Sequence, residues 1–167
     1  MRKAVLNSSV VIALSALGYL NKLKPVFEEV LIAKAVFEEI CLAGEGLVGE
    51  RELKEAVKTG LIEVKEVKNR VLVTALLDPL ALGEAETIAL AIDEQADQIV
   101  LDDKAARRKA KALKLNVVGT LRILRMMYNS KLISKAEIIK ALTNLRETGF
   151  RINEDVIKKV TDELKYV

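Results

Sequence analysis

The stretch that decides the fold is Gln98-Ile99-Val100-Leu101-Asp102-Asp103, in which a short apolar run ends on two adjacent aspartates. The run is β-branched and is followed at once by a basic helical pattern at 104–114, so it is expected to be a buried strand. Open α/β sheets place their ligands at the carboxyl ends of strands. Two neighbouring carboxylates are also costly to hold without a cation or a hydrogen-bond network. The stretch therefore predicts a strand–helix unit with a metal site at the junction.

The same alternation of strand and helix continues along most of the chain. Further strands are expected at 4–6, 29–32, 61–67 and 116–118, and helices at 9–17, 34–42, 50–58, 84–96 and 121–131. Residues 71–77 are ambiguous and fit a short helix. Strands that alternate with helices favour a parallel sheet covered on both faces. We therefore expect residues 1–132 to form a three-layer α/β/α domain around a central parallel sheet of about five strands.

The last part of the chain has the pattern of paired helices. Ser134 with Glu137 forms a capping box that opens one helix, Gly149 ends it and Asn153 caps the next. We expect residues 133–167 to form a helical hairpin, packed on the α/β domain or on a dimer partner. Because leucine and isoleucine line this hairpin, a homodimer is expected.

Composition narrows the chemistry that is available. The chain has 167 residues, 51% of them hydrophobic but only 4% aromatic, which indicates one domain with an aliphatic core. It has no histidine, which excludes serine–histidine and cysteine–histidine hydrolases and the common zinc sites. The net charge of +3 is too small to indicate a nucleic-acid partner by itself.

The cellular setting is also constrained. Cys41 is the single cysteine, which excludes an internal disulfide and fits a reducing compartment. Asn7-Ser8-Ser9 interrupts the apolar start of the chain, so a signal peptide is not expected, and no stretch approaches the roughly 20 apolar residues of a membrane span. We expect a cytoplasmic protein without a membrane partner. Abundant lysine and glutamate with little glutamine favour a thermophilic source.

Oxygen ligands recur near the ends of predicted strands and the starts of helices. Asn7-Ser8-Ser9 follows the first strand, Glu38-Glu39 lies in the second helix, Glu84 and Glu86 open a later helix, and Asp102-Asp103 follows the fourth strand. If the first and fourth strands are neighbours, Asn7 and Asp103 face one crevice. An oxygen-only set of this kind suits Mg²⁺ or Mn²⁺ and disfavours zinc.

Helical geometry distinguishes within the pairs. At about 100° per residue, Glu39 lies nearer the apolar face of its helix than Glu38. Glu84 and Glu86 flank the core stripe of their helix on opposite sides, so one site is not expected to use both directly. Each group also has a structural explanation, since glutamates favour a first helical turn and aspartates cap helices. Their occurrence together in this order favours a shared acidic site.

Basic residues follow the acidic pair. Helix 104–114 carries six of them, and two more lie near the start of the next helix: Lys104, Arg107, Arg108, Lys109, Lys111 and Lys114, then Arg122 and Arg125. Such charges beside a metal site are suited to holding a phosphate backbone. The alternative is a solvated helix face whose charges serve solubility.

Four motifs in this order resemble the PIN-domain ribonucleases. They are Val5-Leu6-Asn7-Ser8-Ser9-Val10-Val11-Ile12-Ala13-Leu14, Val36-Phe37-Glu38-Glu39-Ile40, Gly83-Glu84-Ala85-Glu86-Thr87-Ile88-Ala89-Leu90-Ala91 and Ile99-Val100-Leu101-Asp102-Asp103. The chain looks most like a prokaryotic PIN-like subfamily with Asn-Ser-Ser, Gly-Glu-Ala-Glu and Asp-Asp motifs, a basic helix and a Gly-Thr turn, here Gly119-Thr120. The resemblance spans roughly residues 4–131, and the C-terminal helical pair is also similar.

The resemblance implies a function and a site. It implies a metal-dependent endoribonuclease that cleaves RNA phosphodiester bonds, acting as the toxin of a toxin–antitoxin pair with an antitoxin protein as partner. Its acidic positions carry over as Asn7, Glu39, Glu86 and Asp103, with Asp102 beside them. The carboxylates of Asp103, Asp102, Glu39 and Glu86 would hold Mg²⁺ or Mn²⁺, and Asn7 would position water or a phosphate oxygen. The residues expected to contact RNA are Lys104, Arg107, Arg108, Lys111 and Arg122, and the expected auxiliary groups are Ser9 and Thr120.

Two other functions stay open at this point. The family usually has aspartate where this chain has Asn7, whose amide brings no negative charge, and this motivates a non-catalytic PIN-like module that binds RNA or protein. A phospho-accepting receiver domain also uses paired acids on a parallel sheet. Its acid pair normally follows the first strand, where this chain has Asn7, which disfavours that class.

Overall fold

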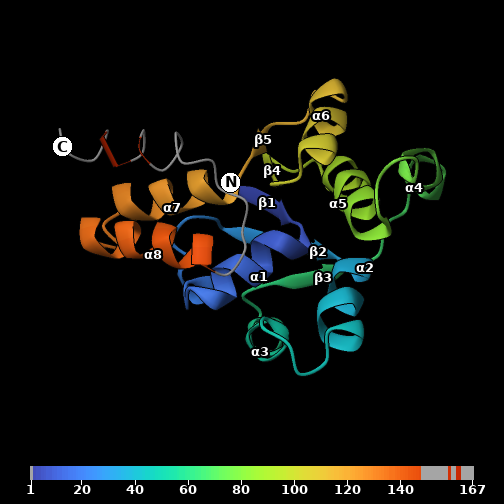
Figure 1. Ribbon diagram of the computed structural model, residues 1–167. Coiled ribbons are helices and arrows are strands. Elements are labelled where there is room, and N and C mark those ends of the chain that lie inside the picture. Colours follow the sequence, from blue (N-terminus) through green and yellow to red (C-terminus); the bar gives the residue numbers. More distant parts are fainter. Residues whose placement is uncertain (1, 148–157, 159–160, 163–167) are drawn as a thin grey trace.

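The core of the protein is a parallel five-stranded sheet, seen in the computed structural model, which describes residues 2–147, 158 and 161–162 (Figure 1). The strand order is β3-β2-β1-β4-β5, and every pairing is parallel. The strands are β1 (Lys3–Leu6), β2 (Glu29–Ala33), β3 (Glu63–Lys65), β4 (Gln98–Val100) and β5 (Val117–Val118). The predicted parallel sheet of about five strands is therefore confirmed.

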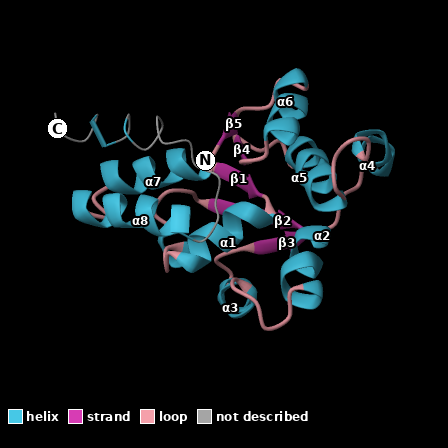
Figure 2. Cartoon of the chain, viewed as in Figure 1, coloured by secondary structure: helices cyan, strands magenta, loops and turns pink. Residues whose placement is uncertain are grey.

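Helices cover both faces of the sheet and complete the predicted three-layer α/β/α fold (Figure 2). They are α1 (Ser8–Ala16), the 3₁₀ turn η1 (Leu20–Leu23), α2 (Lys34–Glu38), the π-helical turn η2 (Glu39–Ala43), α3 (Glu50–Lys58), α4 (Arg70–Leu76), α5 (Leu82–Asp93), α6 (Lys104–Ala112), α7 (Thr120–Asn129) and α8 (Lys135–Glu147). Because both faces are covered, the central strands are apolar after their first residue, and Leu31, Ile32, Ile99 and Val100 are buried.

The order of the strands in the sheet reverses between β1 and β4, which makes this pair the switch point of the topology. From β1 the chain builds outward through β2 and β3, then returns to add β4 on the other side of β1. Leu6 is in register with Val100, and the Asn7 amide donates to the Val100 carbonyl at 3.3 Å. The condition that the first and fourth strands are neighbours is thus met. In open α/β sheets such a switch point opens a crevice at the carboxyl ends of the strands.

Local hydrogen bonds explain the structure of two segments, 71–77, whose prediction was ambiguous, and 61–67, whose predicted strand is too long. Residues 71–77 correspond to a true helix, α4, whose cap Asn69 accepts from the Leu72 amide through its side chain at 3.0 Å. The strand predicted at 61–67 is shorter, because the amides of Leu61 and Ile62 both bond to the Ala56 carbonyl and close the end of α3. That closure uses backbone groups that a longer strand needs for its ladder.

The helix predicted at 34–42 is not uniform. It is α-helical only to Glu38 and then widens into the π-helical turn η2, which begins at Glu39. Gly44 ends this turn, and a Cβ atom there would lie 2.7 Å from the Ile40 carbonyl oxygen. Single π turns inside helices occur frequently at functional sites.

The capping box at Ser134 is confirmed. The Ser134 amide donates to Glu137 Oε2 at 2.6 Å, and the Glu137 amide donates to Ser134 Oγ at 3.2 Å. Helix α8 follows and packs against α7 through a buried face that includes Ile138 and Leu142. The second helix of the predicted hairpin, with Gly149 and Asn153, lies mainly outside the described residues. Within the described residues, no helix is both long and apolar enough to cross a membrane.

Candidate metal centre

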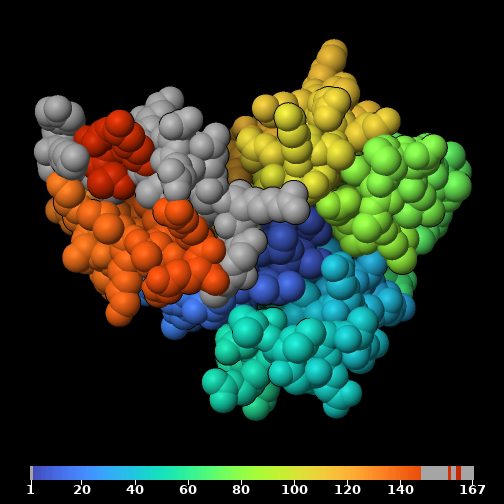
Figure 3. All heavy atoms as spheres, viewed as in Figure 1, coloured from blue at the N-terminus to red at the C-terminus, as the bar shows by residue number. Residues whose placement is uncertain are grey.

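A pocket of about 500 Å³ lies at the carboxyl ends of β1 and β4. Figure 3 shows the start of the chain at the bottom of a hollow between α6 (yellow), α5 (green) and the α2–η2 segment (cyan). The pocket is lined by Asn7, Ser8, Ser9, Glu39, Ala81, Glu84, Asp102, Asp103 and Lys104. Residues that are up to 97 positions apart in the sequence, Asn7 and Lys104, thus meet at one place.

Asn7 forms the floor of this pocket. It is only 5% exposed, and its backbone amide donates a hydrogen bond to the Val100 carbonyl. Its side chain makes no capping bond to α1, although it precedes that helix directly. The neighbouring Ser9 Oγ is also buried and has no hydrogen-bond partner among the described residues. Buried polar groups are normally satisfied, so these two side chains offer unused hydrogen-bonding or ligand capacity to a guest in the pocket.

Glu39 enters the pocket from the first residue of η2. Its Oε2 accepts a hydrogen bond from Ser8 Oγ at 2.7 Å. A Cβ atom on Gly83 would lie 2.7 Å from the same Oε2, so only glycine allows this close approach. Glu38 lines a different pocket, so the choice of Glu39 from helical geometry agrees with the structure.

Glu84 lines the pocket from the first turn of α5, where its Oε2 accepts from the Ala81 amide at 3.1 Å. Burial raises the pKa of Glu84, and the negative charges of Asp103 and Glu39 raise it further. A carboxylate whose pKa is raised by two other carboxylates lies in a site that favours a cation.

Glu86 is not part of this pocket, contrary to the prediction. It lies in a separate cavity of about 390 Å³, where Oε1 is 2.6 Å from Arg70 Nη1 and Oε2 accepts from the Ala35 amide at 3.0 Å. Glu84, on the other side of α5, is the glutamate that lines the acidic pocket. The structure therefore places Glu84 in the position predicted for Glu86, and only one of the two lines the acidic pocket, as expected from helical geometry.

The two aspartates have different surroundings. Asp103 caps α6 by accepting from the Ala106 amide through Oδ1 at 2.8 Å, and it is otherwise exposed at the pocket. Asp102 has both oxygens engaged by Thr120, which donates from its amide at 2.9 Å and its hydroxyl at 2.6 Å. Thr120 is thus a partner of Asp102 rather than a group that reaches the pocket. Asp103 is the better placed of the pair to bind a ligand.

Comparison with known proteins identifies the family. A family model described as a PIN domain matches residues 3–166. The chain belongs to the PIN-domain family. PIN domains are in general metal-dependent nucleases, which agrees with an acidic pocket at this position.

Structural comparison adds a distant neighbour of this PIN domain. A domain of a functionally unknown protein from Methanocaldococcus jannaschii DSM 2661 is 18% identical, with a TM-score of 0.47. The match covers 71% of this chain and 91% of that one. A search of curated proteins gave no match.

The pocket of this PIN domain suits a hydrated ion rather than a fully protein-bound one. In the described part of the chain, no group of three or more acidic, cysteine or histidine side chains forms a ready-made metal site. The donors at the pocket are the carboxylates of Glu39, Glu84 and Asp103 with the amide of Asn7. Mg²⁺ keeps several waters and is usually bound through one or two carboxylates, so this oxygen set fits Mg²⁺ or Mn²⁺.

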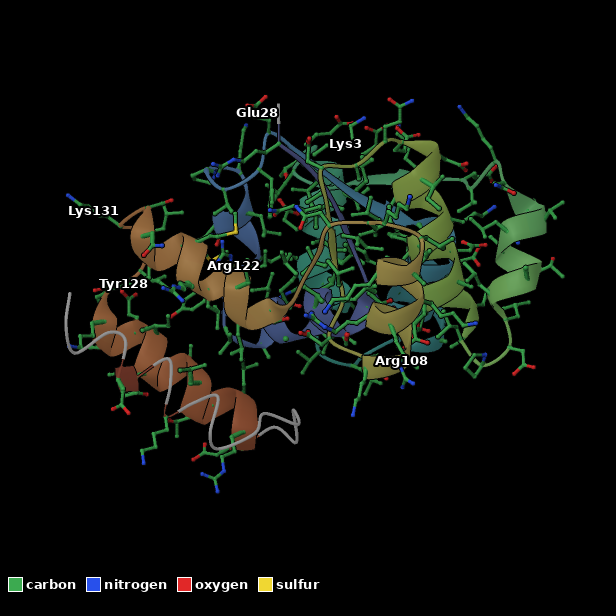
Figure 4. The ribbon with its side chains drawn as sticks, turned by 90° about the horizontal axis from the view of Figure 1, so that it is seen from above. Lys3, Glu28, Arg108, Arg122, Tyr128 and Lys131 are labelled. Atoms are coloured by element: carbon green, nitrogen blue, oxygen red, sulfur yellow. The ribbon has the colours of Figure 1, made fainter. Side chains whose placement is uncertain are left out.

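The basic residues expected to contact RNA have three different surroundings in this PIN domain. Arg107 is half-buried and donates through Nη1 to the Leu101 carbonyl at 2.7 Å, so it fastens α6 to the end of β4. Arg108 and Lys111 are exposed on α6, and Arg122 is exposed on α7. Figure 4 shows that Arg108 and Arg122 extend from these two separate helices. Lys104 lines the acidic pocket itself.

Proposed function

We propose that this PIN domain is a metal-dependent endoribonuclease that cleaves RNA phosphodiester bonds. The observation that carries the proposal is the convergence of Glu39, Glu84 and Asp103 beside Asn7 at the switch point of the sheet. The raised pKa of Glu84, which burial causes first and the charges of Asp103 and Glu39 increase, is consistent with it, because a cation among these carboxylates would relieve their repulsion.

Each pocket residue has a role in this chemistry. Glu39, Glu84 and Asp103 would hold Mg²⁺ or Mn²⁺, directly or through water. When bound, the ion lowers the pKa of a water molecule and stabilises the charge that develops on the phosphate. Asn7 and Ser9 orient that water or a non-bridging phosphate oxygen, and Lys104 attracts the phosphate at the rim. Ser8 acts through Glu39, whose carboxylate it fixes by a hydrogen bond.

The direct test is cleavage of single-stranded RNA by the purified protein with Mg²⁺ or Mn²⁺ and with a chelator. We expect cleavage that depends on the ion and is recovered when the ion is added back. Cleavage that persists in excess chelator contradicts the proposal.

A prediction for RNA binding concerns Arg108 and Lys111, the exposed cations on α6. We expect the double substitution R108A/K111A to weaken RNA binding in a salt-dependent way, reducing the slope of log affinity against log salt by about 1.4, since each lost phosphate contact removes about 0.7 for single strands. Fluorescence anisotropy at several salt concentrations measures this slope. K58A removes an exposed lysine on α3 and is the matched control. An unchanged slope in the double variant shows that these cations do not contact RNA.

A second prediction follows from the raised pKa of Glu84. Without metal, the folded protein binds the Glu84 proton more tightly than the unfolded chain, so stability falls as pH rises from the ordinary glutamate range through the raised value. At neutral pH we therefore expect E84Q to raise the Tm of the metal-free protein while it weakens metal binding. Thermal unfolding with and without Mn²⁺ measures both effects. A Tm that is lower for E84Q than for the wild type contradicts the electrostatic interpretation.

The biological role proposed here is that of a toxin in a toxin–antitoxin pair, working as a cytoplasmic homodimer. The resemblance to the PIN-like subfamily supports it. A neighbouring reading frame that encodes a small DNA-binding protein supports the pairing, and light scattering at micromolar concentration tests the dimer.

One observation favours a second candidate, a PIN-like module that binds RNA without cleaving it. Asn7 supplies no charge at the position where the family usually has aspartate, and Thr120 occupies both oxygens of Asp102, so fewer carboxylate oxygens are left for a cation. RNA binding by anisotropy with no turnover under any divalent ion supports this candidate over the nuclease.

A further inference from the structure

Glu86 lies two residues from a pocket glutamate but serves another part of the fold. It is 6% exposed, on the turn of α5 that also carries Gly83 and Glu84. Residues two apart on a helix lie about 200° apart around its axis. Glu84 therefore faces the acidic pocket while Glu86 faces the amino end of α2.

The contacts of Glu86 complete a helix that has no cap of its own. Helix α2 begins after Ala33, which has no side-chain acceptor, and its first turn contains no acidic residue. Glu86 Oε2 accepts from the Ala35 amide at 3.0 Å, across 51 positions of sequence. Its Oε1 lies 2.6 Å from Arg70 Nη1, which fixes the orientation of the carboxylate. A free amide at a helix start needs such an acceptor.

The cap lies one turn away from a pocket residue. Helix α2 has five residues and passes directly into η2 at Glu39. Ala35 and Glu39 are four residues apart, which is about one helical turn. The end of the Glu39 side chain has a defined place, because Ser8 Oγ donates to its Oε2 and only a glycine at position 83 leaves room for that oxygen. A shift of the start of α2 therefore moves Glu39 out of register with these contacts.

We propose that Glu86 is a positioning residue, which by capping α2 sets the place of the Glu39 carboxylate in the acidic pocket. The proposal rests on the proposed nuclease function. It assigns no metal contact to Glu86, because both of its oxygens are already used by Ala35 and Arg70.

The test compares E86A, E86Q and the double variant A33S/E86A. E86A removes the acceptor, whereas E86Q keeps an oxygen for the Ala35 amide. Ala33 has φ −72° and ψ 152°, an extended conformation that suits an N-cap, so a serine there can accept from the same amide. Three quantities are measured: hydrogen exchange of the Ala35 amide, Mn²⁺ affinity by electron paramagnetic resonance, and kcat and KM for single-stranded RNA.

We expect E86A to accelerate exchange at Ala35 and to lower Mn²⁺ affinity and kcat roughly tenfold, with KM for RNA unchanged, as is typical when a group that orients a ligand is lost. E86Q is expected to stay within about threefold of the wild type, because its amide oxygen can accept from Ala35 while its NH₂ group faces Arg70, whose side chain is 57% exposed and can turn toward solvent. A33S/E86A is expected to recover protection, Mn²⁺ affinity and kcat together. E55A removes an exposed carboxylate from α3, away from the start of α2, and is expected to behave as the wild type.

Several outcomes overturn the proposal. One is a folded E86Q variant whose Mn²⁺ affinity and kcat fall as far as those of E86A. Another is an A33S/E86A variant whose Ala35 amide is again protected from hydrogen exchange but whose Mn²⁺ affinity stays low. If E86A alone does not fold, recovery of folding and Mn²⁺ affinity by A33S supports the proposal, and failure to recover them overturns it. A wild type that neither binds Mn²⁺ nor cleaves RNA overturns the proposed function and the positioning role with it. If the wild type binds Mn²⁺ and cleaves RNA, and E86A has the same Mn²⁺ affinity and kcat, only the positioning role is overturned.

Discussion

D103N is expected to reduce metal-dependent RNA cleavage by about 100-fold or more while leaving the fold intact. Asp103 Oδ1 caps α6 through the Ala106 amide, and asparagine is as good an N-cap as aspartate, so this structural bond survives. What is lost is the negative charge at the edge of the acidic pocket. Steady-state cleavage and Mn²⁺ binding, with the Tm as a measure of folding, separate the two effects.

D102N is the matched comparison for this prediction. Both oxygens of Asp102 accept from Thr120, and an asparagine turns an NH₂ group toward one of these donors. We expect D102N to lower the Tm by more than D103N does, since a buried donor loses its partner. Full activity in D103N, or the same pattern of losses in both variants, would show that Asp103 is a helix cap and nothing more.

G83A is expected to lower cleavage roughly 10- to 100-fold with little change in stability. The new Cβ atom would lie 2.7 Å from Glu39 Oε2, which is the far end of a flexible side chain. The clash is therefore relieved by moving the carboxylate rather than the backbone, and Glu39 leaves its hydrogen bond with Ser8. A group that is displaced by about 1 Å at a catalytic site can lose most of its effect.

A double-mutant cycle with E39Q checks the mechanism of this loss. If G83A acts through Glu39, it adds little further loss in the E39Q background, because the carboxylate that it displaces is already neutralised. Additive losses in E39Q/G83A would show instead that Gly83 matters for another reason, such as the packing of α5.

The layer architecture was readable from the sequence because it depends on patterns within single elements. Short apolar runs such as 99–101 must be buried on both faces, and the helices between them carry one apolar face each. The same local reasoning selected Glu39 over Glu38, since both choices depend only on the angle between residues on one helix. Boundaries were less readable. The end of α3 takes Leu61 and Ile62 out of the predicted strand through backbone bonds that leave no mark in the pattern.

The acidic set was only partly readable for the same reason. Periodicity indicated that one site does not use both Glu84 and Glu86 directly, but the choice between them depends on which elements lie opposite each face of α5. Glu86 is taken by Arg70 and by the bare amino end of α2, contacts that cross 16 and 51 positions of sequence. Likewise, the hydrogen bond from Arg107 to the Leu101 carbonyl joins α6 to the end of β4, a contact that the helical pattern of 104–114 does not predict.

By itself, the sequence determined the parallel sheet, the absence of histidine chemistry and the oxygen-rich strand ends, because hydrophobic period and residue type are local properties. Only the tertiary structure decided which oxygens share a pocket. Packing sets the distances between elements, and those distances divide the glutamates and aspartates into groups that stabilise the fold and groups that stay free for a ligand.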